Sequence, residues 1–400
     1  MRCLLIAASL AACSSLVAQG VVPPYALATL NPFPGLSAGP IPGSSVQQVN
    51  FIHLPSDPPN VFVASFTVTA LPAANGGVGG LDVLMGRYDV LSDTFTPSTE
   101  AAAFNTSGTE FGLMLHPSGL HAVVDRLPGP PILAARPNLT SPFTVIGPVA
   151  PIPSQSYYDP ALAQYRGVPQ LLHVLGLDIA RTPIDLATGA LTGPSVVIAT
   201  NVVGGTANSP SPIVDSNGEL IGLSHHEVVG SDNDHFMSMD LDPLTPAIRF
   251  NDTTTWTNNG GFIGGKFFDA ENSPSPYHVL QIDSYWCSGG RAPVGGTMEI
   301  RAYTPPTNSG AVYISYLLVG ATFSPSAVTI PGVQGALGIG NIIVGFQLPQ
   351  HDNRNGEAMI ALTVPNTPAL SGTVLPLQAI TVDILASTLA LGNTAAMKID

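Results

Sequence analysis

The segment Leu171-Leu172-His173-Val174-Leu175, with the turn after it and the second run at 178–184, is the clearest copy of a unit that recurs along the chain. Each copy has an apolar run, a turn, and another apolar run that ends near an aspartate or a proline. Short apolar runs bounded by turn residues are typical of β-strands. The first strands are expected at 61–66, 120–125, 171–175, 219–224 and 277–282, and their partners at 82–88, 131–136, 178–184, 235–241 and 297–303.

The spacing of these units indicates the architecture. Successive units lie about 47 to 60 residues apart, which is the period of blades in a β-propeller. Five units fit between residues 46 and 304. The sequence therefore predicts an all-β protein with a five-bladed propeller over 46–304. A two-sheet sandwich of ten or more strands is the alternative arrangement for the same strands.

A second, smaller β domain is predicted at the C-terminus. The stretch Pro305-Pro306-Thr307-Asn308-Ser309-Gly310 has the composition of a linker. The ninety residues after it, 311–400, contain short apolar strands separated by turns and fit a small β-sandwich. Its ending resembles the C-terminal modules appended to many secreted bacterial proteins, a resemblance that implies attachment or sorting more than chemistry. The similar positions are Leu370-Ser371-Gly372, Gln378-Ala379 and Gly392-Asn393-Thr394-Ala395.

The first residues predict export. One positive charge at Arg2 precedes a short apolar run and then small residues up to Ala18, the pattern of a signal peptide over 1–18. The lead-in at 19–45 is rich in proline and glycine. We expect an extracellular or periplasmic protein. The alternative is a lipid anchor at Cys13, because Leu10-Ala11-Ala12-Cys13 resembles a bacterial lipobox. No later segment has the length and apolar character of a transmembrane helix.

Composition limits the partners. The chain has 12 Lys and Arg against 26 Asp and Glu, a formal net charge of −14, and 45% hydrophobic residues. Its two lysines are Lys266 and Lys398. It lacks the basic stripe that nucleic-acid binding requires. A weakly charged acidic surface suits a neutral ligand such as a glycan or a cell-surface polysaccharide. The sequence leaves the oligomeric state open.

One segment suggests a family. It runs from Tyr157-Tyr158-Asp159-Pro160 through the strand at 171–175 to a polar strand end at Arg181. It resembles one blade of the five-bladed propeller glycosidases of the arabinanase and β-xylosidase group. The resemblance implies acidic residues at the starts of the innermost strands, pointing into a central funnel as general base, pKa modulator and general acid.

The corresponding positions give the candidate site. Glu110, Asp159 and Asp269 are the carboxylates expected to converge as catalytic residues, with Asp159 as base or orienting group. Two carboxyl groups are the minimum for glycoside hydrolysis, since one donates a proton and the other activates water or attacks. The blade after the Asp-Pro blade departs from the family pattern, because Ser209-Pro210 stands where the acid is expected. Catalysis is therefore left open.

Ligand-binding and metal candidates complete the prediction. Tyr158 and Trp286 are aromatic platforms for a sugar face, and His226 is a polar group of the funnel. No cofactor is expected. A divalent cation held between His225 and His235 is the alternative, although no recognised ligand spacing supports it. Cys287 is expected to be a buried apolar residue.

Two functions of different classes follow from these observations. The first is a glycan-processing or glycan-binding protein with its site in the propeller funnel, a glycoside hydrolase if it is an enzyme. The second is a non-catalytic surface or adhesion protein in which the propeller is only a scaffold.

Overall fold

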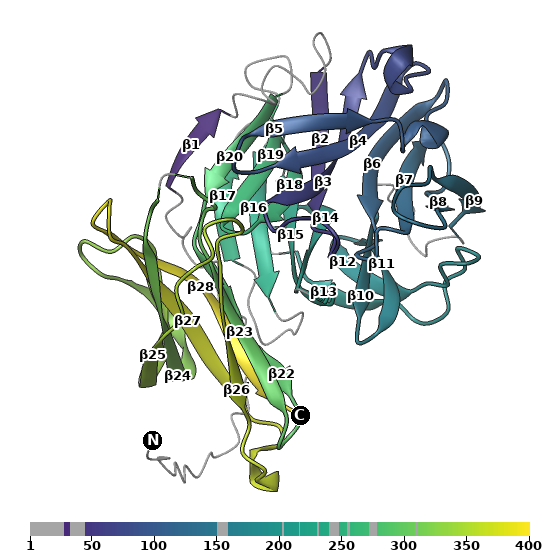
Figure 1. The fold of residues 1–400 in the computed structure, drawn as a ribbon. Coiled ribbons are helices and arrows are strands. Elements are labelled where there is room, and N and C mark those ends of the chain that lie inside the picture. The colour runs from purple at the N-terminus through teal and green to yellow at the C-terminus, as the bar shows by residue number, and fades with distance from the viewer. Residues whose placement is uncertain are drawn as a thin grey trace.

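A computed structural model describes most of the chain beyond the predicted signal peptide. It describes residues 28–32, 45–149, 159–201, 204–215, 217–229, 232–239, 248–253, 257–271, 278–308 and 310–400. These residues form a five-bladed β-propeller followed by a small β-sandwich, as the sequence predicts (Figure 1). Their helical content is limited to the 3₁₀ turns η1 (Ala73–Asn75), η2 (Ala102–Phe104) and η3 (Pro368–Leu370). None of the described helices has the length and hydropathy needed to cross a membrane.

Each blade is a group of four antiparallel strands, and one parallel bridge, between Leu81 and Thr109, joins blades 1 and 2. Blade 1 contains β2 (Ser45–Ile52), β3 (Val61–Thr69), β4 (Leu81–Asp89) and β5 (Thr94–Ser98). Blade 2 contains β6 (Thr109–Leu115), β7 (His121–Leu127), β8 (Ile132–Ala135) and β9 (Thr144–Pro148). Blade 3 contains β10 (Ala161–Tyr165), β11 (Val168–Leu175), β12 (Asp178–Pro183) and β13 (Val196–Ala199). Blade 4 contains β14 (Thr206–Val214), β15 (Leu220–Val229), β16 (Asp232–Met239) and β17 (Ile248–Thr253).

Blade 5 is completed by the N-terminal end of the chain. It contains β18 (Thr257–Ile263), β19 (Lys266–Glu271) and β20 (His278–Asp283), and its outer strand is β1 (Ala28–Pro32). β1 runs antiparallel to β20. The innermost strands β2, β6, β10, β14 and β18 contact one another in that order, and β18 contacts β2. The first and last blades are thus joined twice, once by the strand β1 and once at the centre.

The propeller strands are apolar because both faces of a blade are covered by neighbouring blades. In β3, all seven residues between Val61 and Thr69 are buried, so burial does not alternate as it does in a half-exposed strand. Apolar clusters fill the spaces between blades. Polar residues on these faces, such as Ser65 and Thr67, are equally buried. They must therefore find hydrogen-bond partners inside the protein.

The sandwich has two sheets of unequal width. The larger sheet has the order β22 (Arg291–Ala292), β28 (Thr388–Ile399), β27 (Val374–Asp383), β24 (Tyr313–Thr329) and β25 (Ala336–Gln347). The smaller sheet has the order β21 (Trp286–Ser288), β23 (Thr297–Tyr303) and β26 (Glu357–Thr363).

One strand of the predicted fifth unit has different partners from those expected. The sequence pattern joins 277–282 to 297–303 within one blade, whereas β23 (Thr297–Tyr303) pairs with β21 and β26 of the sandwich. The partners of β20 are β19 and β1. The strands of blade 5 therefore end at Asp283, and the segment at 305–310 joins two strands of the sandwich. The pattern predicted strands here correctly, but an apolar run does not specify which strand it pairs with.

The two domains share one apolar core. Side chains of blades 4 and 5, among them Met237 and Phe267, belong to the same cluster as Ile300 and Leu377 of the sandwich. Trp286 lies within this cluster. Its ring stacks on Tyr303 at a centroid distance of 3.8 Å, and its Nε1–H donates to the Gly264 carbonyl of the β18–β19 turn at 2.6 Å.

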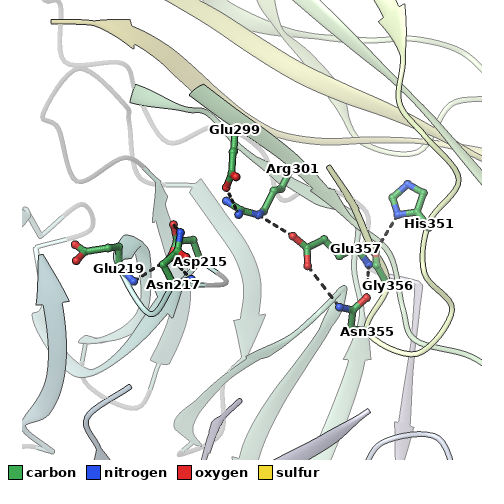
Figure 2. Close-up of polar contacts among 9 residues, drawn as sticks. All are labelled: Asp215, Asn217, Glu219, Glu299, Arg301, His351, Asn355, Gly356 and Glu357. Atoms are coloured by element: carbon green, nitrogen blue, oxygen red, sulfur yellow. Dashed lines mark hydrogen bonds and ion pairs between the residues drawn. The ribbon is translucent and has the colours of Figure 1, made fainter. Parts of the chain in front are cut away.

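A buried arginine lies on the sandwich side of this interface. Arg301 donates to Glu299 and to Glu357, the latter at 2.7 Å, and Figure 2 shows the propeller hairpin that carries Asp215 facing this group. Burial lowers the pKa of Arg301, but Tyr303, Glu357, Glu299 and Asp215 raise it by more, so the guanidinium stays charged. The carboxylates from both domains therefore stabilise one buried cation.

Candidate functional site

The innermost strands share a break in their pairing near the point where each begins. Register shifts interrupt β2 between Val46 and Gln48, β6 between Phe111 and Met114, β14 between Asn208 and Ser211, and β18 between Asn259 and Gly261. Asp159 lies just before β10, at the corresponding place in blade 3. β-bulges re-aim side chains and occur often beside functional sites.

Four blades also have left-handed backbone at this level. The residues are Gly112, Asp159, Ser209 and Gly261, with φ values of 63°, 50°, 47° and 86°. Glycine adopts this conformation freely, but a residue with a Cβ pays about 1–3 kcal/mol for it. Blades 3 and 4 thus carry backbone strain where blades 2 and 5 do not. We call this level of the ring the axial site; it comprises Gln48, Gly112, Asp125, Asp159, Asn208, Ser209 and Gly261.

Asp159 is held at the centre of the axial site by its neighbours from three other blades. Ser209 donates its hydroxyl to Asp159 Oδ2 at 2.5 Å. Gly112 lies against the other oxygen: a Cβ there would overlap Asp159 Oδ1 and would lie 3.1 Å from Gln48 Oε1. The Gly112 N–H, freed by the bulge, donates to Thr67 Oγ1 of blade 1 at 3.0 Å. Glycine at 112 therefore allows the close approach that brings Asp159 and Gln48 together.

Asp125 is the second carboxyl group of the axial site. It lies on β7 and is 1% exposed. Burial raises its pKa to about 7, and the charge of Asp159 adds to this, while the backbone N–H groups of Arg126 and Asp159 oppose it. Burial likewise raises the pKa of Asp159 to about 7 against the hydrogen bonds from Ser209 and Gln48. Because like charges in a buried site repel, the pair holds about one proton near neutral pH.

The axial site is rich in acceptors that lack donors. Within the axial site, one side-chain oxygen on each of four residues is buried without a hydrogen-bond partner among the described residues. These oxygens are Gln48 Oε1, Asp125 Oδ1, Asp159 Oδ1 and Asn208 Oδ1. Each residue is at most 8% exposed. A buried acceptor without a donor costs about 1–3 kcal/mol, so this group is suited to a ligand that brings donors.

A row of polar side chains leads from the axial site into blade 5. Asn208, His226 and His235 lie opposite one another across β14, β15 and β16. His235 Nε2 lies 3.2 Å from Asp269 Oδ2 of β19. Burial lowers the pKa of His226 well below its usual range, and the neighbouring histidines His235 and His225 lower it further. His226 is therefore neutral.

Glu110 is at the expected place in the chain but does not join Asp159 in any described contact. It is the second residue of β6, at the start of an innermost strand as predicted. Its carboxylate accepts hydrogen bonds from Thr106 Oγ1 at 2.6 Å and from Arg126 Nε at 3.2 Å. Glu110 is thus engaged in a structural ion pair. The neighbour that Asp159 has instead is Asp125, which sequence reasoning missed because it ends an ordinary apolar strand.

The other predicted residues are dispersed. Asp269 is on the second strand of blade 5 and contacts His235 instead of the carboxyl pair. His226 adjoins the axial site through Asn208, as just described. Trp286 belongs to the interface with the sandwich, because its strand β21 pairs with β23. Tyr158 lies outside the described residues.

The described residues include no group of three or more His, Cys, Asp and Glu side chains placed to hold a metal ion. His225, one of the predicted ligands, lies 3.5 Å from Glu227 through its Nε2 atom. Cys287 is buried, and its thiol donates to the Asn393 carbonyl at 3.4 Å. It is packed in the core shared by the two domains.

Comparisons with known proteins found similar chains among solved structures alone. No protein-family model matches the chain, and no curated protein matches it. Among solved structures, a Bacteroides ovatus protein described as xyloglucan PUL GH43B is 9% identical at a TM-score of 0.42, with 88% of this chain and 90% of that chain covered. The GH43 BlXynB protein from Bacillus licheniformis is 8% identical at a TM-score of 0.43, with 92% and 91% covered.

A third similar structure is the xylan β-1,4-xylosidase from Bacillus halodurans C-125, at 9% identity and a TM-score of 0.39, with 89% of this chain and 95% of that chain covered. Structures of the glycosidase group that the Asp159-Pro160 segment resembles are therefore among those similar to this chain. The overlap is loose, and the five-bladed architecture rests on the strand pairing described above.

Proposed function

We propose that this chain is an exported propeller protein that binds a neutral glycan at the axial site. The observation that supports this most is the set of four buried acceptor oxygens without donors. Sugar hydroxyl groups are donors, and a neutral glycan brings many of them without bringing a charge into a buried site. The backbone strain at Asp159 and Ser209 supports the same site, because strain is retained where it serves a function.

Glycan processing is the reaction that this site would support. Asp159, when ionised, would accept a proton from water as the water oxygen attacks the anomeric carbon. The glycosidic C–O bond breaks, and the leaving oxygen takes a proton from an acid. Asp125 shares one proton with Asp159 near neutral pH and would set how often Asp159 is ionised. Among the described residues, Glu110 is engaged with Arg126 and Ser209 occupies the position expected for the acid.

That last observation favours the second candidate, a propeller that holds a glycan or serves as a surface scaffold without turnover. Ser209 donates its hydroxyl to Asp159 and cannot supply a proton as a carboxylic acid does. The two candidates differ in one measurable respect, which is hydrolysis of the bound ligand.

The test is binding and turnover of arabino-, xylo- and galacto-oligosaccharides by the purified protein, with Asp159→Asn in parallel. We expect wild-type binding by calorimetry and a loss of about 10- to 100-fold in affinity for Asp159→Asn, the range for one charge-assisted hydrogen bond. Product analysis by chromatography separates hydrolysis from binding alone.

Asp185→Asn is the matched control, because Asp185 lies at a turn of blade 3 and its carboxylate accepts hydrogen bonds only from the Ala187 N–H and the Thr188 hydroxyl among the contacts described. It should bind as the wild type does. Failure of every oligosaccharide to bind the wild type, or equal affinities for wild type and Asp159→Asn, would refute glycan binding at the axial site.

A further inference from the structure

The β24–β25 hairpin of the sandwich is free of charge. From Tyr313 to Gln347, 35 residues include no Asp, Glu, Lys or Arg. β25 is the edge strand of the five-stranded sheet, and its only partner among the described strands is β24. In Figure 1, β24 and β25 lie on the outer side of the sandwich. The hairpin therefore ends the sheet with a neutral edge.

The middle of β25 is apolar and exposed on both faces. Ile342, Ile343 and Val344 are 49%, 43% and 47% exposed. The reason is the unequal width of the two sheets: the smaller sheet has three strands and leaves the end of the five-stranded sheet uncovered. Val344 pairs with Val319, whose side chain is buried, so this face of β25 continues the core-facing side of the sheet.

Edge strands of this kind usually carry a protective feature. A free edge presents unpaired N–H and C=O groups, and proteins protect it with charged side chains, prolines or short strands. β25 is 12 residues long and has neither a charge nor a proline; its one irregularity beside the apolar triplet is a register shift that leaves Ile343 without a partner on β24. A left-handed residue at Asn341 bends the strand but leaves the apolar triplet 342–344 after it. The chemistry of this edge fits another extended, uncharged strand.

The distribution of charge indicates which strand. Residues 285–400 have five acidic and four basic side chains, which leaves 21 acidic and eight basic side chains for residues 1–284. The balance is therefore −1 for the sandwich region and −13 for the rest. Two copies of the chain repel each other through their propellers, whereas their sandwiches can approach without that cost.

We propose that β25 pairs antiparallel with β25 of a second copy, so that the five-stranded sheets of two sandwiches form one continuous sheet. A two-fold axis near Ile343 makes the contact self-complementary: Ile342 of each copy faces Val344 of the other. The apolar triplets cover each other, and the free backbone groups of both edges pair. The propellers, with most of the charge, remain apart. This assembly is independent of what the axial site binds.

Light scattering on a size-exclusion column, with a concentration series, tests the proposal on the purified protein. We expect an apparent mass about twice that of the monomer for the wild type. A lysine at the edge places like charges opposite each other, so Ile343→Lys should shift the protein to the monomer. Leu385→Lys is the matched control: Leu385 is 64% exposed, in the turn between β27 and β28, and its replacement should leave the dimer intact.

Ile343→Cys provides a second test that does not depend on weakening the fold. Mild oxidation of the protein purified without its signal peptide should link two copies through residue 343, because Cys287, the one cysteine among the described residues, is buried in the core and does not compete. A wild type that stays monomeric throughout the series overturns the proposal and leaves the edge to a different partner. A dimer that persists in Ile343→Lys and does not cross-link through residue 343 overturns it as well, by placing the interface elsewhere.

Discussion

At the scale of single residues, the axial site combines two costs that a purely structural position would avoid. Asp159 has left-handed backbone and a buried carboxyl group, and it lies beside the second buried carboxyl group of Asp125. Blades 2 and 5 reach the same level of the ring with Gly112 and Gly261. Glycine at the position of Asp159 would remove both costs. The carboxyl pair is thus the feature of the ring that calls for a functional explanation.

The pair predicts a pH dependence of stability. Burial raises the pKa of Asp125 and of Asp159 to about 7 in the folded protein, against 3.8 as the ordinary value. The folded state therefore binds protons more tightly than the unfolded state. The stabilisation that these bound protons give to the folded state is fully present below pH 3.8 and is lost as the pH rises through 7. One pKa unit corresponds to about 1.4 kcal/mol, so titration of each of the two carboxyl groups lowers the free energy of unfolding by on the order of 4 kcal/mol.

Thermal unfolding of wild type and Asp159→Asn between pH 4 and 8 checks this. The fall in stability with rising pH should be smaller in Asp159→Asn, because one buried charge no longer forms. Asp185→Asn is the control, because the pKa of Asp185 is shifted in the opposite direction: backbone and side-chain hydrogen bonds lower it. Removing this carboxylate should therefore not reduce the fall in stability with rising pH. Equal slopes in wild type and Asp159→Asn would show that the carboxyl pair is not buried as described.

Sequence reasoning found part of this site, for a physical reason. Asp159 could be predicted because an Asp-Pro step before an apolar strand is a local signal. Glu110 was placed correctly at the start of an innermost strand, but its ion pair with Arg126 depends on the neighbouring strand. Asp125 could not be found, because its importance comes from the contact between blades 2 and 3, which no local pattern encodes.

At the scale of elements, the outer strand β1 contributes to closing the propeller. It is the outer strand of blade 5 and pairs with β20, so it joins the N-terminal end of the chain to the last blade. The pairing runs from Ala28 opposite Asp283 to Pro32 opposite Leu280. The sequence pattern places this stretch in the lead-in before the propeller, because a short run among prolines and glycines has no strand pattern of its own.

Replacing residues 28–32 with glycine and serine should therefore destabilise blade 5 before the other blades. We expect hydrogen exchange to accelerate in β20 and β19 by at least tenfold, while β7 and β11 keep their protection, because a lost outer strand exposes the ladder of its neighbour. The same replacement at residues 20–24, which leaves β1 intact, is the control and should change neither. Unchanged exchange in β20 would mean that β1 adds nothing to the closure of the propeller.

At the scale of the whole molecule, the two domains are joined by a core and not by a flexible linker. The cluster that contains Met237 and Phe267 of the propeller continues into Ile300 and Leu377 of the sandwich. The sequence predicted the boundary from Pro305-Pro306, a composition signal, whereas β23 before it already belongs to the sandwich. An interface with an interior like that of a domain makes the two parts one cooperative unit.

Trp286 tests that cooperativity, because it stacks on Tyr303 and donates to Gly264 of blade 5. Trp286→Ala should lower the free energy of unfolding by about 3–5 kcal/mol, the cost of emptying a large aromatic site, and calorimetry should still show one transition at a lower temperature. Trp286→Phe keeps a stacked ring but loses the Nε1–H donor and the volume of the second ring, so its cost should lie between about 1 kcal/mol, the value of the hydrogen bond alone, and the cost of Trp286→Ala. Two separate transitions, with only the sandwich affected by Trp286→Ala, would show instead that the domains unfold independently. In that case each propeller could change its orientation relative to its own sandwich. In a dimer formed through β25, charge repulsion would then move the two propellers apart, and their relative position would no longer be fixed.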